Sequence, residues 1–322
     1  MDRGVHLIFD GNQTAFRANC TSELYTKDGV RTSAIYGTLK ITHSIAESIL
    51  GLIPFEYGKI KDIVFAWDFG HSERRKKIFP QYKANRKKYK QSEEDRQWMS
   101  DFIEQANVLH TILPLIGIRS IKQKGWEGDD LVYGAIKCIN KLYPNDLCVI
   151  ISTDEDFHQL VSANTWIYNP TKQIIISHNN YKEITGIEQN TFLTYKILKG
   201  DSSDGINGVQ GIGEKTAKDL VNKYGDLCGI LNNEKELMKS KRTARIFSKE
   251  SIEILDRNNK LINLKDFVVL DEVKNYIEDK LTQKTYINLT DFKAFLKQYQ
   301  LVNILSELKS WLEVFEAIIN NS

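Results

Sequence analysis

The sequence has few cysteines and no long apolar run, and each shortage excludes a class of protein. Its four cysteines are far apart and form no Cys-x-x-Cys or Cys/His cluster: Cys20, Cys138, Cys148 and Cys228. They argue against a zinc site or a disulfide framework, and they favour a reducing compartment. The apolar stretch Val5–Phe9 is too short for a signal peptide and far too short to span a membrane. We therefore expect a soluble cytoplasmic protein with no membrane partner.

Common catalytic motifs are also missing. The six histidines are scattered, and the chain contains no Gly-x-Ser-x-Gly motif. It contains no Gly-x-x-x-x-Gly-Lys-[Ser/Thr] phosphate-binding loop either, so ATP use is not indicated. A histidine- or serine-based mechanism is therefore the weaker option, and attention turns to the charged residues.

Charge is unevenly distributed along the chain. Residues 71–90 contain nine lysines and arginines against one acid, Glu73, which gives this basic segment a net charge of +8. The whole chain carries +2, so the remaining residues sum to −6. A cationic segment beside an acidic body suits a polyanion that must approach carboxylates. On its own, such a segment is as often a solvated basic loop.

Apolar strands alternate with helices over roughly the first 180 residues. Four apolar segments read as strands, at residues 5–10, 61–68, 117–121 and 147–152. Helical spacing of apolar residues marks the segments 33–50, 93–115 and 127–142. The alternation predicts an α/β fold whose central, largely parallel, twisted sheet is covered by helices. From about residue 186 onward strand patterns fade and helices dominate.

Carboxylates gather where the predicted strands end. In such sheets functional groups collect at the carboxyl ends of strands, and Asp10, Asp68 and Asp154 fall there. The full candidate set has nine members: Asp10, Asp68, Glu127, Asp129, Asp130, Asp154, Asp156, Asp201 and Asp204. Taken singly, the acids that open helices are more often caps, since a first-turn carboxylate gains about 0.3–1 kcal/mol from the free N–H groups.

Together, the nine carboxylates point to metal-dependent hydrolysis. At one edge of a sheet they would repel each other strongly without compensating cations. Hard oxygen ligands suit Mg²⁺ or Mn²⁺ rather than zinc. Two such ions about 3.5–4 Å apart activate a water and stabilise the leaving oxygen in phosphodiester cleavage. We therefore predict a site for two or more divalent ions.

Two further segments favour a nucleic acid substrate. Aromatic residues interleave with the charges of the basic segment, as a single-strand path requires, and helical runs on either side of Pro80 predict an arch. Gly208–Ala217 has an apolar-glycine-apolar-glycine pattern before an amphipathic helix, which matches a helix-hairpin-helix. Its glycines allow close backbone approach, and the next helix offers free N–H groups to phosphate. The alternatives are a mobile loop for the first segment and a plain tight turn for the second.

Six motifs occur in the order found in the FEN/5′-nuclease family, which the chain resembles over roughly residues 5–230. They are Phe-Asp-Gly at 9–11, Phe-Pro-Gln-Tyr-Lys-Ala-Asn-Arg at 79–86, Trp-Glu-Gly-Asp-Asp at 126–130, Ser-Thr-Asp-Glu-Asp-Phe at 152–157, Leu-Lys-Gly-Asp-Ser-Ser-Asp at 198–204, and Gly-Val-Gln-Gly-Ile-Gly-Glu-Lys-Thr-Ala at 208–217. The family includes bacteriophage 5′-3′ exonucleases, phage-type ribonuclease H and the 5′ nuclease domain of bacterial DNA polymerase I. The resemblance implies a PIN-like fold and a structure-specific enzyme that cuts 5′ flaps and degrades 5′ ends of DNA and RNA–DNA hybrids, removing RNA primers. If a phage encodes the chain, its compartment is the host cytoplasm.

The resemblance also implies roles for single residues. The nine carboxylates would hold Mg²⁺ or Mn²⁺, while Lys83 and Arg86 would steer the scissile phosphate as catalytic residues. Tyr82 would stack at the entrance of the arch. The hairpin would hold a monovalent cation, K⁺, through the main-chain carbonyls of Gly208, Val209 and Ile212. Further nucleic-acid contacts would come from Arg74, Arg75, Lys199, Gly211, Gly213 and Lys215.

Domain organisation and partners complete these expectations. An α/β nuclease core at 1–185, with a helical arch at about 71–98, would precede a helical region at 186–322 that contains the hairpin motif at 205–224 and C-terminal helices. We expect a monomer that binds DNA with a 5′ flap, nick or RNA primer; a single-strand binding protein or sliding clamp remains open as a partner.

Two other functions compete with the 5′ nuclease. A non-catalytic protein that binds branched DNA would not need nine carboxylates facing a polyanion. Another acidic-site metal-dependent phosphohydrolase would have the carboxylates, but the arch and the hairpin have no place in it.

Overall fold

The computed structural model describes residues 3–85, 92–266 and 271–321. Its centre is a six-stranded sheet made of β1 (Arg3–Asp10), β2 (Tyr57–Trp67), β3 (Arg119–Lys122), β4 (Leu147–Ile151), β5 (Thr165–Asn169) and β6 (Ile174–Ile176). The strand order is β3-β2-β1-β4-β5-β6, and only the β5–β6 pair is antiparallel. The predicted largely parallel sheet is confirmed.

β1 is a central strand with helices over both of its faces. Its register pairs Ile8 with Val64 of β2 and with Ile150 of β4. Residues 4–9 of this strand are all buried, which explains their nearly continuous apolar run. Because the parallel strands end at one edge of the sheet, the acids that follow them are brought close together.

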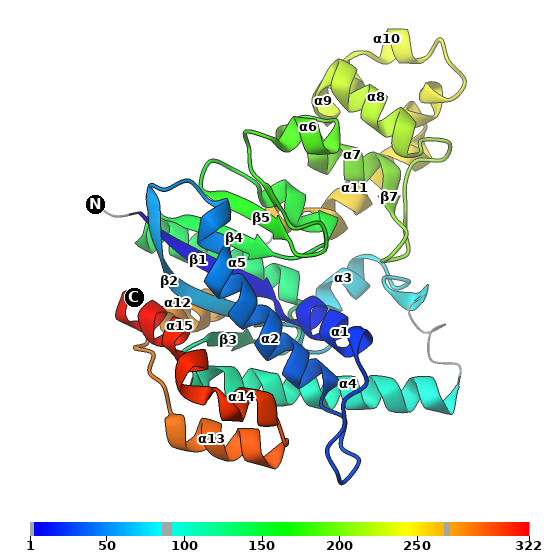
Figure 1. Cartoon of the computed structure of the whole chain (residues 1–322). Coiled ribbons are helices and arrows are strands. Elements are labelled where there is room, and N and C mark those ends of the chain that lie inside the picture. The colour runs from blue at the N-terminus through cyan, green and yellow to red at the C-terminus, as the bar shows by residue number, and fades with distance from the viewer. Residues whose placement is uncertain (1–2, 86–91, 267–270, 322) are drawn as a thin grey trace.

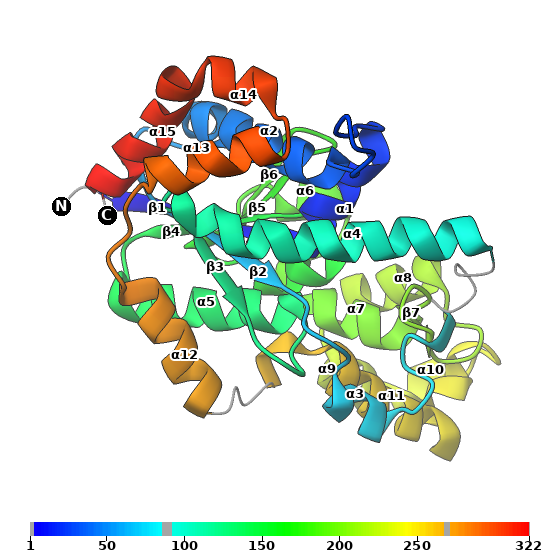
Figure 2. The same ribbon diagram turned by 90° about the horizontal axis from the view of Figure 1, so that it is seen from below.

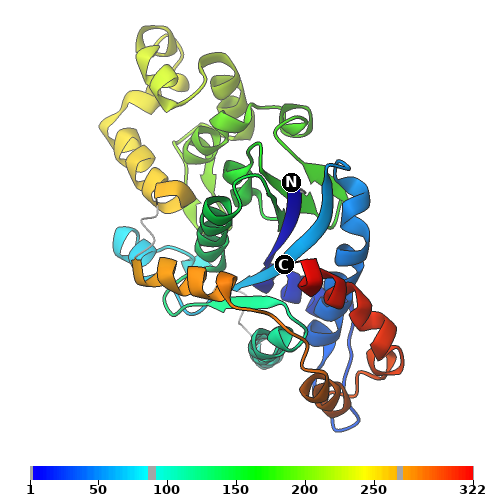
Figure 3. The same ribbon diagram turned by 90° about the vertical axis from the view of Figure 1, so that its left-hand side faces the viewer.

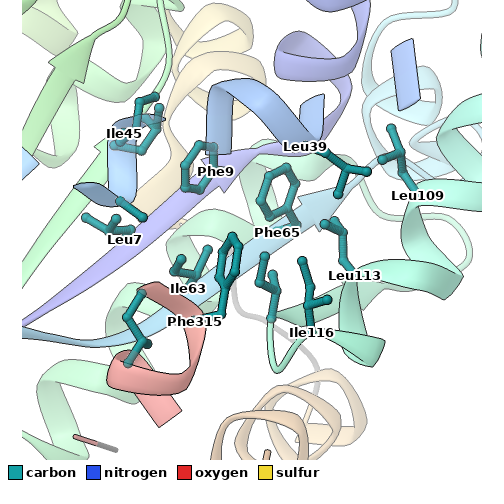
Figure 4. Packing of buried hydrophobic residues seen from close by; sticks show 14 of the residues in the cluster. Leu7, Phe9, Leu39, Ile45, Ile63, Phe65, Leu109, Leu113, Ile116 and Phe315 are labelled. Carbon is teal, nitrogen blue, oxygen red and sulfur yellow. The ribbon is translucent and has the colours of Figure 1, made fainter. Parts of the chain in front are cut away.

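One face of the sheet is covered by helices from both ends of the chain (Figure 2). They are α1 (Gly11–Thr21), α2 (Ser33–Ser48), α4 (Glu93–Ile112), α13 (Leu289–Gln298), α14 (Val302–Ser306) and α15 (Leu308–Asn321). Figure 4 shows this core, where Phe9 and Phe65 stack with ring centroids 4.5 Å apart and Phe315 of α15 packs close by. The opposite face packs against α5 (Gly128–Leu142) and α12 (Asp271–Thr282). The same apolar cluster continues into α6 (Tyr181–Thr185), α7 (Phe192–Lys199), α8 (Glu214–Tyr224) and α11 (Lys249–Ile262).

A small second sheet joins α7 to α8. Its antiparallel strands are β7 (Gly200–Asp201) and β8 (Ile206–Asn207), in a region where the sequence predicted mainly helices. Short helices complete the chain: α3 (Glu73–Ile78), α9 (Leu227–Asn232), α10 (Glu234–Leu237), and the 3-10 turns η1 (Ile49–Leu52), η3 (Leu113–Leu115), η4 (Glu155–Leu160), η5 (Gln189–Thr191), η6 (Thr243–Phe247) and η7 (Leu264–Asp266). The helix–hairpin–helix arrangement is therefore present.

The helices after residue 186 lie in two places. α8, α9 and α10 form one end of the molecule, whereas α13 to α15 return to the α/β core at the other end (Figures 1 and 3). Trp311, Leu312, Phe315 and Ile318 of α15 are buried. The division at 185/186 stays a prediction. Of the helices in the described ranges, none is both long and apolar enough to cross a membrane.

Candidate active site

Two aspartates are fixed at the ends of neighbouring strands. Asp10 ends β1 and caps α1, where its Oδ1 accepts the Gln13 N–H at 3.0 Å. Asp68 follows β2, and its Oδ1 accepts the Gly128 N–H at 2.6 Å. The Asp68 N–H donates to Asn12 Oδ1 at 2.8 Å. Main-chain hydrogen bonds thus join the end of β1, the end of β2 and the start of α5.

The start of α5 carries three acids in close proximity. Glu127 and Asp130 form a reciprocal capping box around the first turn. Together with Asp129, each offers one carboxylate oxygen that lies within 4.8 Å of the others, close enough to hold one metal ion. We call Glu127, Asp129 and Asp130 the α5 cluster.

The guanidinium of Arg75 is a buried counter-charge that pairs with all three carboxylates of the α5 cluster. Its side chain is 1% exposed; it donates to the Glu127 carboxylate, to Asp129 at 3.3 Å and to both oxygens of Asp130 at 2.9 and 3.0 Å. Burial opposes the charge, but Asp129 and Asp130 outweigh it and hold the pKa of Arg75 well above its usual value. The sequence predicted a nucleic-acid contact here; the structure buries Arg75 instead, because three adjacent carboxylates require a counter-charge.

Burial and neighbouring carboxylates raise the pKa values of the carboxyl groups in the site, whereas nearby cations lower them. Burial, aided by Asp68, Asp154 and Asp129, raises the pKa of Asp10 to about 8. Burial and the adjacent Asp129 also raise the pKa of Asp130. For Glu127 burial acts upward too, but Arg75 and Lys83 outweigh it and lower the pKa. Burial therefore favours the protonated forms of Asp10 and Asp130, although Arg75 pairs with Asp130.

The first part of the basic segment closes over the α5 cluster. The Tyr82 hydroxyl lies 2.9 Å from Glu127 Oε2 and 3.0 Å from Asp204 Oδ2. Lys83 Nζ lies 2.7 Å from Glu127 Oε1 and 3.7 Å from Asp204 Oδ2. The main-chain N–H of Lys83 donates to the Asp204 carbonyl at 2.9 Å. Tyr82 is 4% exposed, so this conformation does not offer the stacking surface that the sequence predicted. The cause is the pair of carboxylates that share its hydroxyl.

A second buried cation bridges the other acids. Lys196 Nζ of α7 lies 2.7 Å from Asp156 Oδ1 and 2.8 Å from Asp201 Oδ2. Asp154 caps η4 by accepting the Asp156 N–H at 2.9 Å. Sequence reasoning missed Lys196, although a lysine within the apolar run of α7 is an available sign of a buried partner.

Electrostatic contacts connect these groups into one site. Asp10 interacts with Asp68, Asp129 and Asp154, and Asp154 interacts with Asp129 and Asp204. Lys196 links Asp156 to Asp201 through ion pairs, and the Tyr82 hydroxyl links Glu127 to Asp204. The structure therefore brings all nine predicted carboxylates to one edge of the sheet, while their roles as metal ligands stay a prediction.

The hairpin offers an exposed surface next to this edge. Gly211, Gly213 and Lys215 are exposed at the start of α8, and Lys199 is partly buried at the end of α7. At Gly208 a Cβ would lie 2.2 Å from the Lys199 carbonyl oxygen, so the backbones approach as the glycine pattern predicts. The exposed Arg74 lies on α3. Arg86, and with it the middle of the predicted arch, lies outside the described residues.

An acidic site at the carboxyl edge of a parallel sheet, beside a helix-hairpin-helix, defines a nuclease. Comparison with known families agrees with the geometry. The model of the 5′-3′ exonuclease N-terminal resolvase-like domain matches residues 5–186, and that of the 5′-3′ exonuclease C-terminal SAM fold matches residues 187–286. The chain belongs to the 5′-3′ exonuclease family.

Individual relatives extend this result. The chain is 30% identical to a 5′-3′ exonuclease of Buchnera aphidicola over 258 residues, which is 79% of this chain and 81% of the relative. It is 29% identical to a 5′-3′ exonuclease of Aquifex aeolicus over 297 residues, 90% and 93% of the two chains. A solved structure of the bacteriophage T5 flap endonuclease with DNA and metal ions has the same fold, with a TM-score of 0.70 at 23% identity over 87% of this chain and all of the other (100%).

Proposed function

We propose that this nuclease cuts 5′ flaps and 5′ ends of DNA and RNA–DNA hybrids, using two or more Mg²⁺ or Mn²⁺ ions held by the nine carboxylates. The observation that carries the proposal is the collection of these nine carboxylates at one edge of the sheet, where they outnumber the cations Arg75, Lys83 and Lys196 that pair with them among the described residues. The donors are all oxygens, which fits hard divalent ions. The proposed setting is the cytoplasm, on replication intermediates with a flap, nick or RNA primer.

Different groups of the chain would hold the ions, bind the scissile phosphate and bind the duplex. Bound at the carboxylates, the ions supply a water of lowered pKa and stabilise the leaving oxygen. Lys83 already lies on the acidic edge, so a phosphate drawn there meets its ammonium group; we assign Arg86 to the same phosphate. The α8 N-terminus and Lys215 bind the duplex backbone without reading sequence. The carbonyls of the hairpin, at Gly208, Val209 and Ile212, would hold K⁺.

Cleavage of a labelled 5′-flap duplex tests this function. We expect Mg²⁺-dependent cleavage that EDTA abolishes and that the double variant Asp154→Asn, Asp156→Asn loses. The matched control is Glu155→Gln, which removes an exposed carboxylate between those two positions and leaves cleavage unchanged. Intact protein that cuts neither with Mg²⁺ nor with Mn²⁺ would contradict the proposal.

A further inference from the structure

The C-terminal end of α11 contacts several segments around the site described above, although no sequence motif marks it: α7, β8, Phe79, Arg75 and Gln159. Asn258 is fully buried, at 0% exposed, and all hydrogen-bonding positions of its amide are used. Its Nδ2 donates to the carbonyls of Ile197 in α7 and Asn207 in β8, both at 3.0 Å. Its Oδ1 accepts from Arg257 Nη2 at 2.8 Å and Nε at 3.2 Å. Because every donor and acceptor of the Asn258 amide is used, its side chain is held in one orientation and joins α7 to β8.

Arg257 connects the same hairpin to the base of the basic segment. Its Nη2 donates to the Asn207 carbonyl at 2.9 Å, and its guanidinium carbon lies 4.7 Å from the ring centroid of Phe79. Phe79 packs beside Tyr82 and Ile206 in a small apolar cluster with the end of α11. One planar guanidinium therefore contacts β8 on one side and the residue that begins the segment over the α5 cluster on the other.

The last turn of α11 contacts Arg75 and, through Gln159, the Asp154–Asp156 turn. The Leu261 carbonyl accepts Arg75 Nε at 3.2 Å. The Ile262 carbonyl accepts Gln159 Nε2 at 3.1 Å, and the same Nε2 donates to the Asp156 carbonyl at 2.9 Å. Both carbonyls belong to the final four of the helix, which have no partner within it. A shift of α11 along its axis would therefore move Arg75 and the Asp154–Asp156 turn together.

We propose that Arg257 and Asn258 are positioning residues that transmit duplex binding at the hairpin to the acidic site. The hairpin binds the duplex, as the proposed function assumes. Through its contacts, α11 then restricts the motion of Phe79, Tyr82 and Arg75. Coupling of this kind travels through packed side chains and rigid elements. Within the described part of the chain, the side-chain hydrogen bonds of the two residues go to each other and to the carbonyls of Ile197 and Asn207, so we expect them to act through these neighbours.

Hydrogen exchange at the base of the basic segment tests the coupling without any cleavage. Duplex DNA without a flap, added in EDTA, is expected to slow exchange at the amides of Tyr82, Lys83 and Ala84, which donate to Phe79, Asp204 and Gln81. In Arg257→Ala the slowing is expected to disappear, while affinity for the duplex stays within about twofold. Single-turnover cleavage of the flap is expected to fall about tenfold, because misplacement of the site costs rate rather than binding.

Three further variants separate coupling from charge and from folding. Lys260→Ala removes an exposed cation of the same helix, which pairs with Asp256, and should leave exchange and cleavage unchanged. Arg257→Lys keeps the charge but loses the planar fork, so it should behave like Arg257→Ala. Asn258→Asp keeps the acceptor for Arg257 but cannot donate to the two carbonyls. It should lower cleavage as well, and Arg257→Ala covers the case in which it does not fold.

Either of two results would overturn the proposal: wild-type protein that binds duplex without any change in exchange, or Arg257→Ala that weakens binding and cleavage in equal proportion. Wild-type protein that fails to cut flaps would contradict the proposed function instead, and the exchange result would still decide the coupling.

Discussion

Arg75 and Lys196 occupy the interior of the acidic edge. Arg75 pairs with the three carboxylates of the α5 cluster, and Lys196 lies between carboxylates from two elements, η4 and β7. A buried charge is tolerated only when it is paired, and here each cation pairs with acids that would otherwise repel one another. Arg75 joins α3 to α5, and Lys196 joins α7 to the Asp154–Asp156 turn and β7. The residues that organise the site are thus basic, although the residues proposed to bind metal are acidic.

Replacing Arg75 should destabilise the metal-free protein. In Arg75→Ala the α5 cluster loses its buried counter-charge, and we expect the free energy of unfolding to fall by about 3–5 kcal/mol. Urea unfolding in EDTA measures this change, and added Mg²⁺ should restore part of the loss. Lys77→Ala, at an exposed position of the same helix, serves as control and should change stability little. Equal stability of the two variants would contradict the role of Arg75.

The raised pKa values predict how stability depends on pH. Asp10, with its pKa raised to about 8, and Asp130, with its pKa raised by burial, hold protons that the unfolded chain releases near its ordinary value of about 4. The native state therefore binds more protons than the unfolded state, and without divalent ions stability should fall as pH rises from about 5 to about 8. The lowered pKa of Asp201 acts only in acid, below this window.

Divalent ions should reverse this trend, because they bind the deprotonated carboxylates and replace the lost protons. The gain in Tm on adding Mg²⁺ is therefore expected to grow over the same pH range. Thermal unfolding from about pH 5 to about pH 9, with Mg²⁺ and with EDTA, measures the difference. Asp10→Asn should flatten the EDTA curve. Parallel curves for wild type in the two conditions would contradict the prediction.

Among the elements, the hairpin depends on contacts that leave no room for a side chain. A Cβ at Gly208 would meet the Lys199 and Leu198 carbonyl oxygens at 2.2 and 2.3 Å, so Gly208→Ala must separate β8 from α7. We expect a loss of about 1–3 kcal/mol in stability and weaker duplex binding, measured by unfolding and by fluorescence anisotropy. At Gly213 a Cβ meets no atom of the described chain within 4 Å, and φ is −88°. Gly213→Ala is the control for stability, and a similar loss of stability there would contradict the argument.

The longer elements could be predicted from the sequence, and the shortest could not. β1, β2 and β4 are buried on both faces and appear as continuous apolar runs, which identify them directly. β7 and β8 have two residues each, too few for any periodicity. The nine carboxylates were predictable because strand ends in a parallel sheet meet at one edge. The burial of Arg75 and Tyr82 was not, since it depends on α5 and Asp204, which are distant in sequence.

For the whole molecule, the C-terminal helices are a structural part of the nuclease core. α13 to α15 place Phe292, Phe295, Trp311 and Phe315 in the core that contains β1 and β2. Deleting residues 287–322 would expose this face, and we expect the shortened chain to aggregate or to lose cooperative unfolding. Size-exclusion chromatography and thermal unfolding check the result, with Glu316→Ala at an exposed position of α15 as control. A monomeric shortened chain with unchanged Tm would contradict it.

The place of α15 also governs when the chain can fold during its own synthesis. β1 leaves the ribosome first, yet its partner β4 begins at Leu147, and the helix that covers β2 ends with Asn321 donating to the Ile60 carbonyl at 3.2 Å. Pairings between such distant residues are slow to form because the entropy cost of closing a long loop comes before the contact can stabilise the chain. The part of this apolar face that α15 covers therefore stays exposed until residues 308–321 have emerged, which makes the nascent chain a candidate for chaperone binding until then.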